Sequence, residues 1–499
     1  MTNDQAYRQL AEKLQRVHLL GTVGELLGWD EQVFLPPGGA EQRAAQTAVV
    51  AEARHAASSE ARVGELLGQL EAAAGTLTAD QQVVVRQARK DYDRATRLPA
   101  EFVREKAEWC SRAYHAWAEA RAKSDFPAYA PFLEKHLALA KREAAYLGWG
   151  DRPYDYMLDL HDPGTTAALI APLFAELQVG LVPLVRTVLA SPRQTPTSAL
   201  RGFPVPAQAA FLREVTERLG FDFQHGRIDV STHPFCSGTG ADVRMTTRFD
   251  VDNPLDSLFS AIHETGHGLY EQGLPAAQAG TALGLAAGMG VHESQSRLWE
   301  NQVARSREFW RFFEPKWRAM FPAQTAALSG EALYREINAV RPTLIRVDAD
   351  EVTYNLHILL RFELEQRLFS GELAVRELPA AWREAAVTLL GRAPGCDREG
   401  VLQDVHWSGG AFGYFPSYCL GNMMAAQLWY RAQTVLPGLA EDFAAGDFSR
   451  LLGWLRQEVH AHGRRYELPE LVRRATGAPL SPAPLLRYLR ERYLPLYTE

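Results

Sequence analysis

The sequence predicts a mainly α-helical protein with one small β-sheet. Apolar residues recur at intervals of three and four along most of the 499 residues, as in helices that bury one face. One stretch, residues 227–249, is instead rich in β-branched residues that alternate with polar ones. Residues 191–206 are rich in Pro, Ser and Thr and resemble an exposed connector, but nothing indicates two independent domains. We therefore expect a single domain over residues 1–499.

The helices follow one another along the chain between breaks at proline and glycine. In the first half we expect helices over residues 4–28, 40–72, 79–96, 99–124, 126–147, 166–190 and 206–219. Their breaks fall at Pro36-Pro37-Gly38-Gly39, Gly75, Leu98-Pro99, Gly148–Pro153 and Gly220. In the second half we expect helices over residues 256–272, 291–320, 330–341, 351–369, 378–391, 417–435, 447–462 and 482–492.

The predicted sheet comes between these two sets of helices. Arg227–Ser231 and Val243–Phe249 have strand-like alternation, and the glycine-rich run Ser237–Gly240 lies between them. We interpret the two stretches as a β-hairpin.

Composition excludes several classes of protein. With 53 Lys and Arg against 60 Asp and Glu, the net charge is -7, so we expect no general attraction for nucleic acid or an anionic membrane. The four cysteines show no CxxC spacing and are too few for a disulfide framework. The N-terminus shows no basic start followed by an apolar run, so we expect no signal peptide. Together these features predict a cytoplasmic protein.

The most apolar long segment covers residues 168–190. It contains Pro172, Glu176, Pro183 and Arg186, and its apolar residues recur at helical spacing. These features predict a buried amphipathic helix rather than a membrane span.

The strongest chemical signal is the run His263-Glu264-Thr265-Gly266-His267. Residues four apart lie on the same face of a helix, so the two imidazoles can bind one divalent cation. The glutamate beside the first histidine can then reach a water molecule next to that cation. A helix with two surface histidines is the structural alternative, and a third ligand separates the two interpretations.

A catalytic zinc site usually has three protein ligands and one open position. Glu271 lies two turns beyond His263, so its carboxylate points away along the helix. Residues 273–290, as a mobile lid or a passive connector, are long enough to bring a second helix back across the first. That helix offers His292 and Glu293, which point about 100° apart. The chemistry favours Glu293 as the third ligand, with His292 as the alternative.

Further motifs follow in a fixed order. They are His233-Pro234-Phe235, Asp242-Val243-Arg244-Met245-Thr246 (DxRxT), His292-Glu293-Ser294-Gln295-Ser296, Ile345-Arg346-Val347-Asp348-Ala349-Asp350 (IRxxAD), and Gly400–Trp407 (GxxQDxHW) with Gly413–Tyr418. Together with the HExxH run, they resemble those of the carboxypeptidase Taq-type metallocarboxypeptidase family. The likeness spans nearly the whole chain and departs at none of these motifs.

The resemblance implies an all-helical fold in which two lobes flank a deep substrate cleft. It also implies release of single residues, with broad specificity, from peptides with a free C-terminus, and assembly as a homodimer. The implied cofactor is one divalent metal per chain, zinc or alternatively cobalt, with Glu293 as its third ligand.

On this hypothesis a metal-activated water attacks the last peptide bond. Glu264 is the general base that takes the proton of the water and passes it to the leaving amine. The tetrahedral intermediate needs further hydrogen-bond donors at its oxyanion. His406 and either Tyr414 or Tyr418 are candidates, because they lie in the motif-rich segment and can donate. For each tyrosine, a role as a core aromatic is an equal alternative.

An exopeptidase of this kind must also recognise a free carboxylate, which an arginine can bind through two parallel hydrogen bonds. Arg346 is the first candidate, and Asp348 or Asp350 can either orient it or form a purely structural salt bridge with it. Arg244 is the second candidate, although with Asp242 it can instead stabilise the strand that carries it.

Two further roles stay open. A metal-bound histidine usually donates its second N–H to a carboxylate or carbonyl; Asp404 and Asp242 are candidate partners, and the sequence does not choose between them. His233 can either line the substrate cleft or pack beneath it.

Three other functions fit parts of the pattern. An endopeptidase or oligopeptidase would share the metal site but leave the cleft open beyond the departing residue. A binding protein with a vestigial site would have no reason to keep Glu264. A structural zinc site would be closed and usually rich in cysteine, and none of the four cysteines lies beside the motif.

Overall fold

The computed structural model describes residues 1–196 and 200–498 of the chain. Helices dominate, and the described residues include one three-stranded sheet, which confirms the predicted mainly α fold. Residues 197–199, part of the predicted connector, lie outside the described residues.

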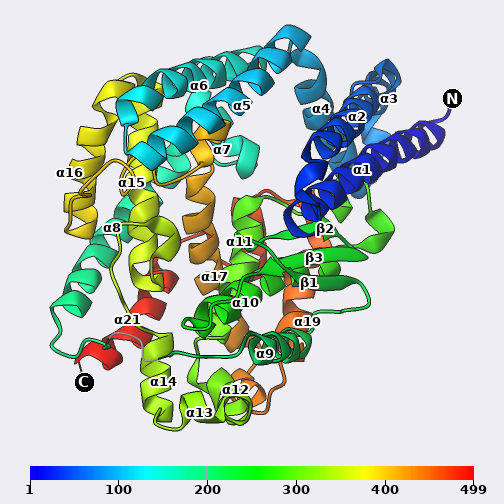
Figure 1. The fold of residues 1–499 in the computed structure, drawn as a ribbon. Helices are drawn as coiled ribbons and strands as arrows, with labels where there is room; N and C mark the ends of the chain where they lie inside the picture. The colour runs from blue at the N-terminus through cyan, green and yellow to red at the C-terminus, as the bar shows by residue number, and fades with distance from the viewer. Residues whose placement is uncertain (197–199, 499) are drawn as a thin grey trace.

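The described helices fall on either side of the sheet in the sequence (Figure 1). Those before it are α1 (Asn3–Val33), α2 (Ala40–Ser58), α3 (Ala61–Ala72), α4 (Ala79–Arg97), α5 (Ala100–Lys123), α6 (Phe126–Tyr146), α7 (Pro153–His161), α8 (Ala167–Ala190) and α9 (Val205–Leu219). Those after it are α10 (Pro254–Gly273), α11 (Met289–Arg297), α12 (Arg307–Met320), α13 (Pro322–Thr325), α14 (Gly330–Ile337), α15 (Glu351–Ser370), α16 (Leu378–Leu390), α17 (Phe415–Val435), α18 (Leu439–Ala444), α19 (Ser449–Glu458), α20 (Leu468–Thr476) and α21 (Ala483–Thr498).

Two predicted helices are interrupted. The helix expected over residues 40–72 divides into α2 and α3, where Ser58 and Ser59 donate side-chain hydrogen bonds to the carbonyl of His55 and end α2. The helix expected over residues 291–320 divides at the π-helical segment Leu298–Val303. Four short helices, α7, α13, α18 and α20, were not predicted, because each is too brief for its periodicity to stand out.

The sheet corrects the predicted hairpin. Its strands are β1 (Gly226–Val230), β2 (Cys236–Thr239) and β3 (Asp242–Thr247), in the order β1-β3-β2. The two predicted strands, β1 and β3, are parallel neighbours, whereas β3 forms its antiparallel hairpin with β2. Because Gly238 has a φ of 85° and a Cβ there would lie 1.9 Å from the carbonyl oxygen of Asp242, that hairpin requires glycine.

Helices α10, α11 and α17 pack together at the centre of the molecule (Figure 1). Glycines allow this close approach on both sides of α11. A Cβ at Gly266 of α10 would lie 2.5 Å from the Cα of Ser296, and one at Gly421 of α17 would lie 2.6 Å from the Cβ of Glu293. Strands β2 and β3 lie against α10 on its other side.

The N-terminal helices α1, α3 and α4 enclose a small apolar core of their own, separate from the main core that extends from Ala120 to Tyr497. Trp29 near the end of α1 joins this group to the sheet, because it lies under the guanidinium groups of Arg244 and Arg227 at 4.2 and 4.9 Å. The division into lobes and the single-domain organisation stay predictions.

One described helix, α8, is long and apolar enough to cross a membrane, a test that core helices of soluble proteins also pass. The predicted helical face is buried, through Phe174, Leu177, Leu181 and Val188, and α8 packs against α15 and α21. These contacts bury one face of α8, while its other face is exposed.

Candidate metal centre

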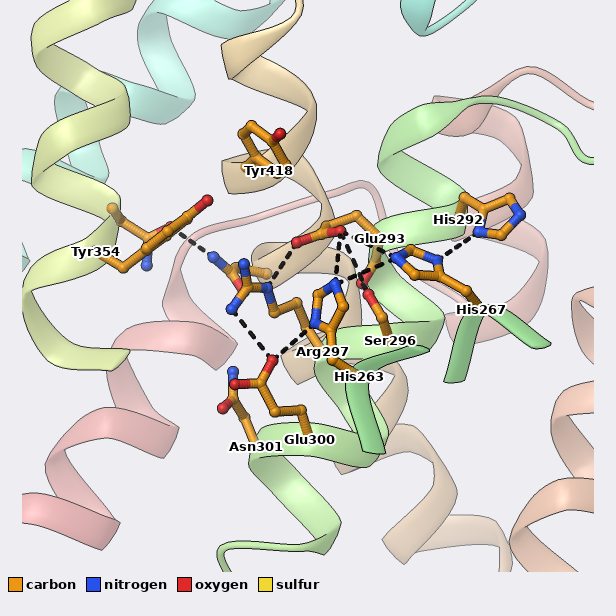
Figure 2. A network of polar contacts seen from close by, with 12 residues as sticks. His263, His267, His292, Glu293, Ser296, Arg297, Glu300, Asn301, Tyr354 and Tyr418 are labelled. Carbon is orange, nitrogen blue, oxygen red and sulfur yellow. Dashed lines mark hydrogen bonds and ion pairs between the residues drawn. The ribbon is translucent and has the colours of Figure 1, made fainter. Parts of the chain in front are cut away.

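The structure brings the three predicted metal ligands together. His263 and His267 lie on one face of α10, and Glu293 reaches them from α11 (Figure 2). The two Nε2 atoms are 3.2 Å apart, and Oε2 of Glu293 lies 3.7 Å from the first and 3.6 Å from the second. Bonds of about 2.0–2.2 Å to a tetrahedral zinc ion require ligand atoms about 3.3–3.6 Å apart. The three side chains therefore fit a small divalent cation.

A buried ion-pair network holds His263 and Glu293 from behind. Nδ1 of His263 lies 2.8 Å from Oε2 of Glu300, and Arg297 donates to Oε1 of Glu293 at 2.6 Å and to Glu300 at 3.2 Å. Burial raises the pKa of Glu300, but Arg297 and His263 outweigh burial and hold it well below its usual range. Glu300 thus stays ionised, and Oε2 of Glu293 is left to face the two histidines.

A different pair lies behind His267. Its Nδ1 is 2.5 Å from Nδ1 of His292, and Nε2 of His292 is 2.9 Å from Oε1 of Glu271. As predicted, Glu271 points away from the ligand cluster. Neither candidate partner, Asp404 or Asp242, holds a ligand histidine, because each binds an arginine elsewhere. Glu300 could have been predicted from the sequence, because Arg297 and Glu300 follow Glu293 by four and seven residues and so share its face of a regular helix.

Glu264 lies beside the cluster with its side chain buried. Burial raises the pKa of its carboxyl to about 7, although His263 acts in the opposite direction. Glu264 lines a cavity of about 930 Å³ together with His263, Arg297, Glu300, Arg341 and Tyr354. A proton acceptor therefore faces a space large enough for part of a peptide.

Arg346 is buried, and its partner differs from the prediction. Its Nε and Nη2 both lie 2.9 Å from Oδ1 of Asp404, while Arg361 binds Oδ2 of the same carboxylate at 2.8 Å through Nε. Burial raises the pKa of Asp404, but Arg361 and Arg346 hold it well below its usual range. Asp350 instead caps α15 and Asp348 is exposed, so neither orients Arg346.

Tyr354, which was not among the residues predicted from the sequence, connects Arg346 to the metal cluster. Its hydroxyl accepts a hydrogen bond of 3.0 Å from Nη1 of Arg346, and the guanidinium of Arg297 lies 4.6 Å from the centre of its ring. No motif contains Tyr354, because it lies on α15 among residues that face the core.

His406, Tyr414 and Tyr418 lie next to this cluster. Nε2 of His406 is 3.3 Å from the hydroxyl of Tyr418, and the rings of Tyr414 and Tyr418 are 5.4 Å apart. Burial lowers the pKa of His406 to about 4, so its imidazole is neutral at pH 7 and carries one N–H. Burial, with the carboxylate of Glu293, raises the pKa of Tyr414 to about 12, which keeps its hydroxyl protonated. Figure 2 shows Tyr418 on the side of Glu293 that faces Tyr354.

Two predicted substrate-binding residues lie elsewhere. Arg244 binds Asp242 through Nε at 2.8 Å and Nη2 at 3.1 Å, and its guanidinium covers Trp29. These contacts correspond to the alternative role of stabilising the strand. His233 is exposed in the connection between β1 and β2 and is not among the residues that line the 930 Å³ cavity.

A mainly helical fold with two histidines one turn apart and a glutamate from a second helix defines a metallopeptidase-like protein. Comparison with known proteins makes the class specific. Residues 9–493 match the model of the carboxypeptidase Taq (M32) metallopeptidase family. The chain belongs to this family.

Relatives and solved structures agree along the full length. Thermostable carboxypeptidase 1 of Thermus thermophilus is 43% identical over 510 aligned positions that cover 100% of both chains. Carboxypeptidase 1 of Bacillus subtilis is 38% identical, with 98% of each chain covered. The crystal structure of the M32 carboxypeptidase from Deinococcus radiodurans R1 has 46% identity and a TM-score of 0.96, covering 99% of this chain and 100% of that one.

Proposed function

We propose that the protein is a metal-dependent carboxypeptidase that releases single residues from the free C-termini of peptides. The observation that carries the proposal is that one cavity is lined by His263 of the cation-binding cluster and by the buried Glu264, while Arg346 contacts Tyr354 at the wall of the same cavity. Family membership supports the same activity.

His263, His267 and Glu293 would hold the divalent cation. When bound, such a cation supplies Lewis acidity toward a peptide carbonyl and toward water. Glu264 takes a proton from the attacking water and gives it to the leaving amine. The raised pKa of its carboxyl suits this double task, because the proton is gained and lost near neutral pH. The hydroxyls of Tyr414 and Tyr418 and the single N–H of neutral His406 are the donors available to the oxyanion.

Charge balance supports Arg346 as the group that recognises the substrate carboxylate. Arg346 and Arg361 share the one carboxylate of Asp404, and burial raises the pKa of the neighbouring Glu365 to about 7. Because a carboxyl with this pKa is about half ionised at pH 7, the group keeps a net positive charge of about one half in a buried position. A terminal carboxylate balances this charge, whereas an amidated terminus does not.

Three further statements belong to the proposal. Zinc fits the nitrogen and oxygen donor set, and cobalt is the alternative. The four cysteines are free, which agrees with a cytoplasmic protein. Assembly as a homodimer rests on the family resemblance, and we expect no nucleic-acid partner.

A mass-spectrometric time course tests the activity. Two N-acetylated peptides of one sequence, one with a free C-terminus and one amidated, are incubated with the protein and zinc or cobalt, with a chelator control. Successive single-residue losses from the free peptide alone are expected. Internal cuts in both peptides would show an endopeptidase instead. Glu264→Gln should keep the metal and lose nearly all turnover; turnover near the wild-type rate would refute its role as general base.

A second comparison tests carboxylate recognition. Arg346→Ala should reduce kcat/KM for the free peptide by at least 100-fold, the order expected when a bidentate charged contact of about 3 kcal/mol is lost. Arg341→Ala, which removes an exposed arginine from the same cavity, is the matched control and should change kcat/KM less than threefold. A larger effect of Arg341→Ala than of Arg346→Ala would show that Arg346 is not the residue that recognises the carboxylate.

A further inference from the structure

We propose that His292, held by Glu271, is a positioning residue that fixes the orientation and tautomer of the metal ligand His267. The proposal rests on the proposed function, because it assigns His267 to the metal site.

Consecutive residues of α11 contact both nitrogens of one imidazole. Oε2 of Glu293 lies 3.6 Å from Nε2 of His267, and Nδ1 of His292 lies 2.5 Å from its Nδ1. An Nε2 that faces a cation must carry the lone pair, so Nδ1 of His267 carries the proton and donates it to His292. His292 then accepts at Nδ1 and holds its own proton at Nε2.

Glu271 completes the arrangement from α10. Its Oε1 accepts the hydrogen bond from Nε2 of His292 at 2.9 Å and so selects the tautomer whose Nδ1 can accept. Glu271 is four residues after His267 on the same face of α10, and Glu293 directly follows His292 on α11. Glu271 thus holds His292, and His292 holds the His267 ring at the nitrogen opposite the one that faces Glu293.

The same hydrogen bonds exclude His292 as a ligand. One of its nitrogens faces His267 and the other faces Glu271, so neither is free for a cation. The ring also packs edge-on against Tyr270, with centroids 5.0 Å apart, and Figure 2 shows it behind His267 on the side away from Glu293. His263 differs, because its Nδ1 binds the carboxylate of Glu300 directly.

The test measures zinc affinity of the metal-free protein by competition with a chelating indicator. His292→Ala is expected to weaken zinc binding 10- to 100-fold, the range for loss of such an outer partner. Glu271→Ala is expected to weaken it less. In the His292→Ala background, adding Glu271→Ala should change affinity less than twofold, because Glu271 acts through His292.

The matched control is His460→Ala. His460 is buried and its ring also lies near Tyr270, at a centroid distance of 5.1 Å, while its Nε2 is 2.9 Å from the side-chain oxygen of Gln295 rather than from a metal ligand. His460→Ala should leave the zinc affinity within twofold of the wild-type value. Both His460→Ala and His292→Ala should lower the unfolding temperature of the metal-free protein. Equal losses of affinity in the two would mean that a cavity, not positioning, weakens binding, and would overturn the proposal.

Cobalt-substituted protein gives a second reading. His292→Ala should keep the visible absorption bands of the wild type, because the ligands are unchanged. Bands shifted to those of a site that has lost a nitrogen ligand would show that His292 binds the metal, which also overturns the proposal. Wild-type zinc affinity in both His292→Ala and Glu271→Ala would likewise overturn the proposal. Failure of the wild type to bind zinc or cleave the free peptide would instead refute the proposed function.

Discussion

Gly266 offers a quantitative test of how helix packing sets the metal site. It lies between Thr265 and His267 on α10, directly against Gln295 and Ser296 of α11. A Cβ added there would lie 2.5 Å from the Cα of Ser296 and 2.6 Å from the carbonyl oxygen of Gln295. Both are backbone atoms, so no side chain can rotate away to make room.

The required movement is large on the scale of a metal site. Non-bonded carbon atoms are comfortable at about 3.5–4.0 Å, so α10 and α11 must separate by about 1 Å. Metal–ligand distances tolerate only about 0.2 Å. Since α10 carries His263 and His267 while α11 carries Glu293, Gly266→Ala should weaken zinc binding at least tenfold. Overpacking should also lower the free energy of unfolding by about 1–3 kcal/mol.

The assay is a zinc titration of metal-free protein together with urea unfolding. Gly453→Ala is the matched control, because this exposed glycine of α19 has open space around its Cα. It should leave zinc affinity unchanged and stabilise the fold by up to about 1 kcal/mol through helix propensity. Wild-type zinc affinity in Gly266→Ala would show that the helix spacing does not control the ligand geometry.

Two further predictions concern buried carboxylates. Burial raises the pKa of Asp162 to about 6, and its Oδ1 accepts a hydrogen bond from the backbone N–H of Gly290, near the start of α11. The native state therefore favours the protonated form of Asp162. As the pH rises from 4 to 8, the free energy of unfolding of the wild type should fall by up to about 3 kcal/mol relative to that of Asp162→Asn. Urea unfolding of both metal-free proteins at the two pH values measures this difference, and a difference that does not change with pH would contradict the prediction. Asp404→Asn should lower the free energy of unfolding by about 3–5 kcal/mol, because Arg346 and Arg361 would share a buried site without a counter-charge. A decrease below about 1 kcal/mol in the same urea unfolding measurement would show that solvent reaches the two arginines.

The long helices and the metal ligands could be predicted from the sequence because helix geometry is local. Apolar spacing predicted helices such as α10 and α15 to within a few residues. The spacing of His263 and His267 placed both imidazoles on one face of α10 before any tertiary contact was known. The choice of Glu293 over His292 followed from the chemistry of such sites and from the family resemblance.

Partners far apart in the sequence were decided by tertiary structure. Strands β1 and β3 pair in parallel rather than as the predicted hairpin. Arg346 binds Asp404, which lies 58 residues away in the sequence, rather than the nearby Asp348 or Asp350. Tyr354 reaches the site without any motif. Which of several equally suitable carboxylates or hydroxyls approaches a side chain depends on how helices pack, and local spacing carries no information about that packing.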